Sequence, residues 1–226
     1  MRTPTRLRTK LVAVAGAAIL SVGVAACGSD SDSDSSSSSD SSSKSAPKPV
    51  ASLDDVTGKS TAIKLDAGFT DALTTLKLTP GVTGDGALTD GSLVFPITGG
   101  NVTVFKKGEV SPYVIGQLQH VTSGLTLTAG DTTVKLSNFN VDPGVSRVYG
   151  DVEVNGEPAA SSAFLFQLDG RTLEPLATEG TDAILTGTKV EISEVAAGLL
   201  NEVFKTDAVT AGLLVGIATI TVDVPA

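Results

Sequence analysis

The sequence predicts a mainly β fold with two short helices, arranged as an antiparallel sandwich or a barrel-like single domain. Runs of alternating apolar and polar residues recur between turn residues along most of the chain after residue 60, as half-buried strands require. Only two segments have helical spacing instead. Tryptophan is absent and aromatic residues are 4% of the chain, so Val, Leu, Ile and Ala must fill the core. One cysteine in 226 residues allows no disulfide framework, and stability must therefore come from packing.

The first predicted strand leads directly into the first predicted helix. Residues 61–65 alternate as a strand, and Asp66 is suited to cap a helix. Phe69, Leu73 and Leu76 then recur at helical spacing and form one apolar face. This segment is expected to pack its helix against the sheet.

A β-hairpin is predicted next. Residues 93–97 and 102–105 both read as strands, and Gly99-Gly100-Asn101 between them is typical of a turn.

The middle of the chain is predicted to be strand and turn almost throughout. Its expected strands are residues 114–121, 125–128, 134–141, 148–154 and 163–168. Tight turns such as Ala129-Gly130-Asp131 favour an antiparallel meander with one solvated face for residues 125–128, 134–141 and 148–154. Residues 163–168 follow a loop and are expected to form a buried strand.

The end of the chain repeats the pattern of its beginning. Residues 190–192 alternate, Ser193 can cap a helix, and residues 212–224 form a long alternating strand. An offset of 127 superposes Ile63 on Val190 and Asp66 on Ser193. The pattern predicts two strand–helix–strand units that close one core from both ends, and a chance match between two amphipathic units is the open alternative.

The start of the chain has the pattern of a secretory signal. Four basic residues precede an unbroken run of 16 apolar or small residues, and Ala25-Ala26 lead into Cys27. This order resembles the lipobox of bacterial lipoproteins, and the resemblance implies that Cys27 is lipidated and becomes the N-terminus. A structural thiol and a retained membrane anchor are the alternatives, but the run is shorter than the roughly 20 residues that a spanning helix needs.

These features divide the chain into a signal peptide (1–26), the lipidated cysteine with a disordered Ser/Asp-rich tether (27–50) and a β-rich domain (51–226). The signal holds four of the 16 basic residues and none of the 25 acidic ones, so the chain from Cys27 onward has a net charge of −13. Such a charge disfavours nucleic acid as a partner. The predicted location is the extracytoplasmic face of the cell membrane, with acyl chains as the anchor.

No residue pattern identifies a reaction, and the chain is predicted not to be an enzyme. His120 is the only histidine, and no Gly-x-Ser-x-Gly motif is present to pair with it. One imidazole without a second thiol is poorly suited to hold a metal. The candidate ligand-binding residues are Tyr113, His120 and Tyr149, and the open alternative is that they serve the core or the surface.

Residues 60–155 resemble the HtaA-type domain of actinobacterial haem-acquisition proteins. The residues that carry the likeness, in order, are 67–69, Phe95-Pro96, 116–118, 123–127 and 136–142. The resemblance implies a related surface-domain fold. The family's haem-ligating tyrosine falls on Ala72 and its histidine falls near Thr122, so the resemblance supplies no haem ligand and no cofactor is predicted.

Two functions are therefore expected. The first is a membrane-anchored surface lipoprotein whose domain binds a partner protein or a cell-wall component. The alternative is a carrier of a hydrophobic or haem-like ligand in a cleft between the sheet and the helices.

Overall fold

A long, curled antiparallel sheet makes up most of the structure, which is a computed structural model that describes residues 45–56 and 58–224. The predicted signal peptide, Cys27 and most of the tether lie outside the described residues. The elements are β1 (Ala51–Leu53), β2 (Ser60–Leu65), α1 (Ala67–Thr75), β3 (Thr79–Gly84), β4 (Ala87–Thr89), β5 (Ser92–Pro96), β6 (Gly99–Val104), β7 (Val114–Ala129), β8 (Thr132–Asp142), β9 (Arg147–Val154), β10 (Glu157–Asp169), the 3-10 turn η1 (Gly170–Thr172), β11 (Ala177–Glu179), β12 (Asp182–Ile192), α2 (Glu194–Phe204) and β13 (Leu214–Asp223).

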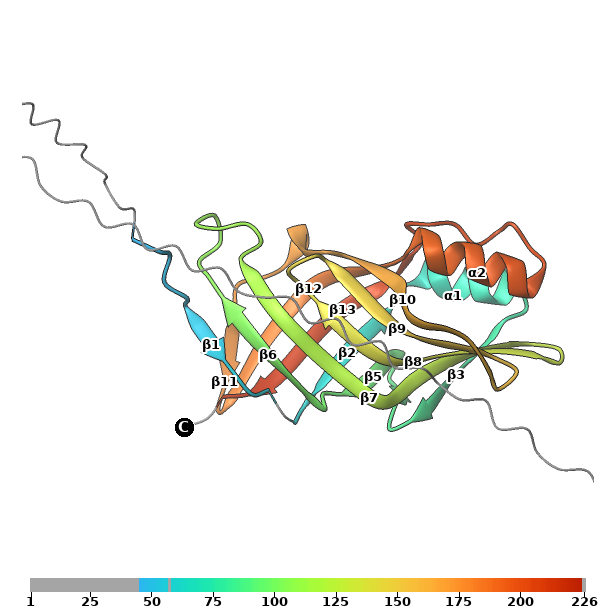
Figure 1. Cartoon of the computed structure of the whole chain (residues 1–226), viewed down its shortest axis with the longest axis horizontal. Helices are drawn as coiled ribbons and strands as arrows, with labels where there is room; N and C mark the ends of the chain where they lie inside the picture. The colour runs from blue at the N-terminus through green and yellow to red at the C-terminus, as the bar shows by residue number, and fades with distance from the viewer. Residues whose placement is uncertain (1–44, 57, 225–226) are drawn as a thin grey trace, which may run out of the picture. The chain divides into compact units, whose positions relative to one another are not determined.

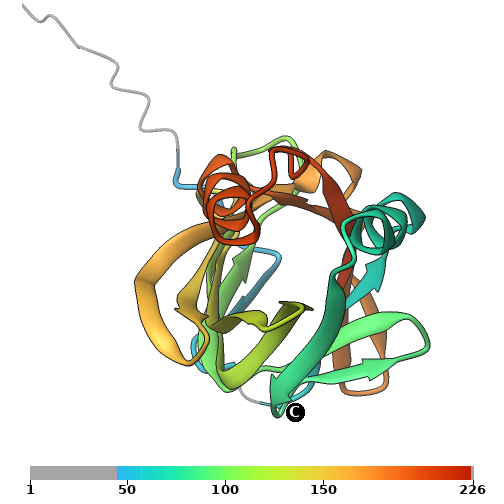
Figure 2. The same ribbon diagram turned by 90° about the vertical axis from the view of Figure 1, so that its right-hand side faces the viewer.

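The sheet curls into a half-barrel, which confirms the predicted β-rich, barrel-like fold with two short helices (Figures 1 and 2). The strand order is β1-β6-β7-β8-β9-β10-β12-β13-β2-β5-β4, with β3 on β7 and β11 on β12. Every pairing between these strands is antiparallel. Because β3 pairs with β7 and β4 pairs with β5, the short β3–β4 connection bridges the two sides of the curled sheet.

The predicted meander is present as β7 to β9, and the strand predicted at 163–168 is part of β10, but two predicted strands are one. Residues 114–121 and 125–128 belong to the single strand β7, whose register against β8 shifts between His120 and Gly124. Thr122 in this bulge has a positive φ, as has Asn138 at the matching irregularity of β8. A bulge sharpens the local twist without ending a strand. Thr122 and Ser123 therefore mark a bend within β7 and not a turn between two strands.

Hydrogen bonds across the sheet hold this line of bulges together. Asn138 Oδ1 accepts from the backbone N–H of Thr122, and Asn138 Nδ2 donates to Asp151 on β9. The other carboxylate oxygen of Asp151 accepts from the N–H of Ser162 on β10. These bonds hold the pKa of Asp151 below its usual range. Side chains thus replace the ladder bonds that four adjacent strands lose where the sheet bends.

The predicted hairpin of residues 93–97 with 102–105 is wrong. β5 pairs with β2 and β4, whereas β6 pairs with β7 and β1. Gly99 and Gly100 belong to strand β6 and not to a turn. A Cβ on Gly100 would lie 2.1 Å from the carbonyl oxygen of Gln117, so this glycine serves the close approach of β6 to β7.

Both helices begin at the predicted caps. Asp66 accepts a hydrogen bond from Gly68 N at the start of α1, and Ser193 accepts one from Ala196 N at the start of α2. The two helices lie at the same end of the half-barrel, so they do not close the core from both ends (Figures 1 and 2). The reason is strand direction: β13 is antiparallel to both β12 and β2, so β12 and β2 run the same way and deliver their helices to one end.

The core lies inside the curl of the sheet. Buried hydrophobic residues extend from Val56 to Val222 in one cluster, and they come mainly from alternate positions of the strands, with Phe69, Leu73 and Leu200 added by the helices. Residues 45–226 form a unit of contacts of their own. Neither helix of the described part has the length and apolar character needed to cross a lipid bilayer.

Candidate functional site

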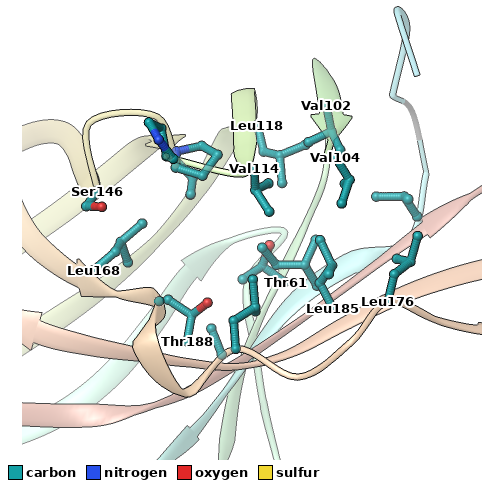
Figure 3. A pocket seen from close by; sticks show the side chains of 18 of the residues that line it. Thr61, Val102, Val104, Val114, Leu118, Ser146, Leu168, Leu176, Leu185 and Thr188 are labelled. Atoms are coloured by element: carbon teal, nitrogen blue, oxygen red, sulfur yellow. The ribbon is translucent and has the colours of Figure 1, made fainter. Parts of the chain in front are cut away.

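The inward-facing side chains do not fill the half-barrel, and they leave a cavity of about 1060 Å³. Figure 3 shows Leu118 of β7 and Val102 of β6 on one side of this space, facing Thr61 of β2 and Leu185 of β12 on the other. Most other lining side chains are aliphatic or aromatic as well. The cavity follows from strand alternation, since every second residue of these strands points to the concave face.

The cavity is closed at the helical end of the half-barrel. Leu125, Phe166 and Val215 line both the cavity and a second space of only about 20 Å³, which Phe69 of α1 and Leu200 of α2 also line. These three residues therefore separate the cavity from the helices. No residue of α1 or α2 lines the large cavity. The interior space therefore lies between strands and not, as expected, in a cleft between the sheet and the helices.

The opposite end holds what we call the mouth of the cavity. It consists of three segments, residues 50–53, 107–113 and 169–176, and each contributes lining residues. Val50, Lys107 and Arg171 in these segments are exposed, whereas Leu118 deeper inside is 1% exposed. The cavity thus runs from a solvent-accessible rim to a closed apolar floor.

The size of the cavity has an energetic consequence. A sealed, dry void of 1060 Å³ would cost about 25 kcal/mol at about 24 cal/mol per Å³. That exceeds the roughly 5–15 kcal/mol by which a folded domain is stable. The space must therefore hold water against apolar walls or an apolar molecule, and small-molecule sites of about 300–1,000 Å³ are of similar size.

His120 is buried at the seam where β7 meets β5. Its Nδ1 lies 2.8 Å from the carbonyl oxygen of Pro96, and its Nε2 lies 3.2 Å from Oγ1 of Thr61. Because a carbonyl only accepts, Nδ1 carries the proton and Nε2 accepts from the Thr61 hydroxyl. Burial lowers the pKa of His120, although the hydrogen bond to Pro96 opposes the shift. The neutral ring joins β7 to β5 and β2.

Tyr113 lines the mouth of the same cavity. Its Oη is buried and has no hydrogen-bond partner among the described residues. The ammonium group of Lys107 lies 5.7 Å from the centre of its ring. Burial raises the pKa of Tyr113, so the phenol stays protonated and can donate a hydrogen bond.

Tyr149 lies away from the other two candidates. It does not line the cavity, and its ring packs against Phe164 with the centroids 6.0 Å apart. Arg147 lies over the ring of Phe164 and donates a long hydrogen bond of 3.4 Å to Tyr149 Oη. The structure therefore brings Tyr113 and His120 to one cavity and leaves Tyr149 in a separate aromatic cluster.

The haem-ligand positions of the HtaA-type family fall outside the cavity. Ala72 is on α1, and Thr122 is an exposed residue in the bulge of β7; neither lines the cavity. His120 uses both ring nitrogens in hydrogen bonds. The described residues hold no group of three or more His, Cys, Asp or Glu side chains that could bind a metal ion. The family's ligand set is therefore not reproduced. Tyr113 lines the space, and its Oη is the one fully buried side-chain oxygen of the described lining residues that has no hydrogen-bond partner.

Several cavity residues were not among the candidates from the sequence. Thr61, Lys107, Leu118 and Leu185 all line it. Strand alternation could have placed Thr61, Leu118 and Leu185 on one face, but only the curvature of the sheet decides that this face is hollow. Lys107 lies in a loop, where the sequence has no periodic signal.

Comparisons with known proteins show similarity at the level of structure. No protein-family model matches the sequence, and no curated protein sequence matches it either. Among solved structures, the C-terminal domain of HtaA from Corynebacterium glutamicum matches 75% of this chain and 98% of that domain, with 14% identity and a TM-score of 0.53. The haem-binding protein HtaB of the same organism overlaps 76% of this chain and 96% of that one, with 11% identity and a TM-score of 0.44. The resemblance seen in the sequence is thus confirmed for the fold: this chain has the fold of the HtaA C-terminal domain.

Proposed function

We propose that residues 51–226 are a non-catalytic carrier domain that holds a large apolar molecule inside the half-barrel, and that acyl chains on Cys27 keep it at the extracytoplasmic face of the cell membrane. One observation carries the proposal: a cavity of about 1060 Å³ with mostly apolar walls and a solvent-accessible mouth. An apolar ligand relieves the unfavourable contact of water with these walls.

The polar groups that line the cavity support binding rather than catalysis. Both nitrogens of His120 are engaged in bonds that join strands, and the hydroxyl that Nε2 reaches belongs to the buried Thr61. Asp169 forms a salt bridge with Arg171 at the mouth, with 2.8 Å between Oδ2 and Nη2. Thr61 Oγ1 lies within hydrogen-bond reach of His120 Nε2, as a nucleophile would lie from its base. Nδ1 of His120, however, donates to the backbone carbonyl of Pro96, so no carboxylate of the described residues orients the ring as in a catalytic triad.

The test blocks the cavity without changing the outer surface. Leu185→Trp places a large ring into the space, whereas Ile184→Trp is the matched control, because Ile184 neighbours Leu185 on β12 and does not line the cavity. Native mass spectrometry of protein purified from its own host should find a bound small molecule in the wild type and in Ile184→Trp but not in Leu185→Trp. An equal ligand load in all three proteins would contradict the proposal.

Haem is a second candidate ligand. The cavity is large enough, and the unpartnered oxygen of Tyr113 lines it. Titration of residues 28–226 with haemin tests this candidate, since ligation by Tyr113 would shift the Soret band at micromolar haemin and Tyr113→Phe would abolish the shift. An unshifted wild-type spectrum would exclude haem and leave the apolar carrier in place.

Partner binding is the other open prediction. A surface or cell-wall protein partner would be recovered by cross-linking on intact cells followed by pull-down. The large exposed hydrophobic residues of the described chain, such as Leu88, Val121 and Val145, come from separate segments and not from one apolar stretch that a partner could cover. The apolar cavity therefore favours the carrier.

A further inference from the structure

The mouth of the cavity has one cation without an acidic partner. Lys107 lines the cavity and forms no salt bridge among the described residues. Its one hydrogen bond to these residues is long, 3.5 Å from Nζ to the carbonyl of Leu173. Arg171 at the same mouth is bound to Asp169, and this pairing lowers the pKa of Asp169 to about 2. The carboxylate therefore stays ionised and neutralises Arg171. Glu174 in the same segment is exposed and does not line the cavity, so Lys107 is the one cation among the described lining residues without a salt bridge.

Tyr113, beside Lys107, has a hydroxyl group with no hydrogen-bond acceptor among the described residues. The ammonium lies 5.7 Å from the ring centre of Tyr113, whose Oη is buried and unpartnered among the described residues. A buried hydroxyl without a partner is destabilising, because it loses the hydrogen bond that water gives it in the unfolded chain. A group that accepts a hydrogen bond from Tyr113 and also carries negative charge would satisfy both side chains.

We infer that the ligand is amphipathic, with its apolar body inside the half-barrel and an anionic oxygen group at the mouth, where it accepts a hydrogen bond from Tyr113 Oη and pairs with Lys107. This inference rests on the proposed carrier function and names the class of ligand. The flexible stem of lysine lets its charged end stay near water at the rim, and charge-assisted hydrogen bonds to carboxylate or phosphate are stronger than neutral ones.

Matched ligand pairs test the charge directly. cis-Parinaric acid and its methyl ester share one apolar body, and only the acid carries charge at neutral pH. Fluorescence titration of residues 28–226 should give about tenfold tighter binding of the acid, which corresponds to about 1.4 kcal/mol. Lysophosphatidic acid and the matching monoacylglycerol, used as competitors, decide whether the head group is a phosphate or a carboxylate.

Variants assign the effect to residues. Lys107→Met keeps the apolar stem and should reduce acid binding to the level of the ester without changing ester binding. Tyr113→Phe should weaken acid binding several-fold. Lys106→Met is the matched control, because Lys106 pairs with Glu109, has a side chain 74% exposed and does not line the cavity; it should behave as wild type.

The outcomes separate the two proposals. Equal affinity of wild type for acid and ester, or equal weakening of both by Lys107→Met, overturns the anionic-head inference and leaves the carrier intact. If neither acid, ester nor either lysolipid-type competitor binds, the carrier proposal fails and this inference fails with it.

Discussion

At the scale of single residues, the only histidine of the chain joins strands that backbone pairing leaves apart. β5 and β7 share no ladder, and His120 connects them through Pro96, with Thr61 of β2 as its second partner. Thr98 contributes at the same seam, since its N–H donates to the carbonyl of Gln119 over 2.8 Å. His120, a candidate ligand-binding residue from the sequence, therefore lines the cavity and also cross-links these strands.

Removal of the imidazole should destabilise the fold. We expect His120→Ala to lower the free energy of unfolding by about 3 kcal/mol, because it leaves a void and two polar groups without partners. Urea unfolding at neutral pH measures this, with Val121→Ala as control, since Val121 is an exposed neighbour. A loss below about 1 kcal/mol would mean that His120 does not stabilise the contact between β5 and β7.

The same residue predicts a pH dependence. The pKa of His120 is lower in the folded chain than its usual 6.5, so the unfolded chain binds the proton more readily. Its contribution is therefore fully present above about pH 6.5 and is lost as the pH falls from there through the lowered folded value. The urea midpoint of wild type should drop over this range, and that of His120→Gln should drop less. Parallel curves for the two proteins would contradict the prediction.

At the scale of elements, the two helices begin in chemically different ways. Asp66 caps α1 from a position near solvent. Ser193 caps α2 while buried: its Oγ accepts from Ala196 N and donates to the carbonyl of Phe164 on β10. The side chain of its N-cap thus anchors α2 to the sheet. At the start of α1, Asp66 reaches the sheet only through its backbone N–H, which donates to the carbonyl of Val215.

This difference predicts unequal losses from equivalent substitutions. Asp66→Ala should cost about 1 kcal/mol, the usual value for an N-cap. Ser193→Ala should cost about 2 kcal/mol, since it also leaves a buried carbonyl without its donor. Chemical unfolding of both variants gives the comparison. Equal losses would show that the contact with Phe164 contributes nothing to stability.

At the scale of the whole molecule, the prediction concerns the anchor, which lies outside the described residues. An acidic chain with a net charge of −13 from Cys27 onward has no electrostatic attraction to anionic lipids, so the proposed attachment depends on acyl chains at Cys27. We expect Cys27→Ala to release the protein from the membrane fraction with an unchanged unfolding midpoint. Membrane flotation after a high-salt wash measures the release, and a variant that still floats would disprove the anchor.

Local signals in the sequence predicted the helices and strands better than they predicted which strands pair. The caps at Asp66 and Ser193 and the meander of β7 to β9 are confirmed, because capping and alternation depend on residues close in sequence. β3 was not expected, since Pro80 and Gly81 read as breakers, yet the long neighbouring strand β7 provides its ladder. The hairpin failed for the related reason that Gly99 and Gly100 serve a close approach between strands and not a turn.

The sequence by itself determined the strand-rich class, the two capped helices, the acidic charge and the expectation of a lipid anchor at Cys27, since each follows from composition or short-range spacing. Only the tertiary structure decided that the concave face is hollow, that Tyr113, Lys107 and His120 border one space, and that Tyr149 does not. The physical reason is that alternation places side chains on a face, whereas the curvature and register of the whole sheet decide whether they meet or leave a cavity.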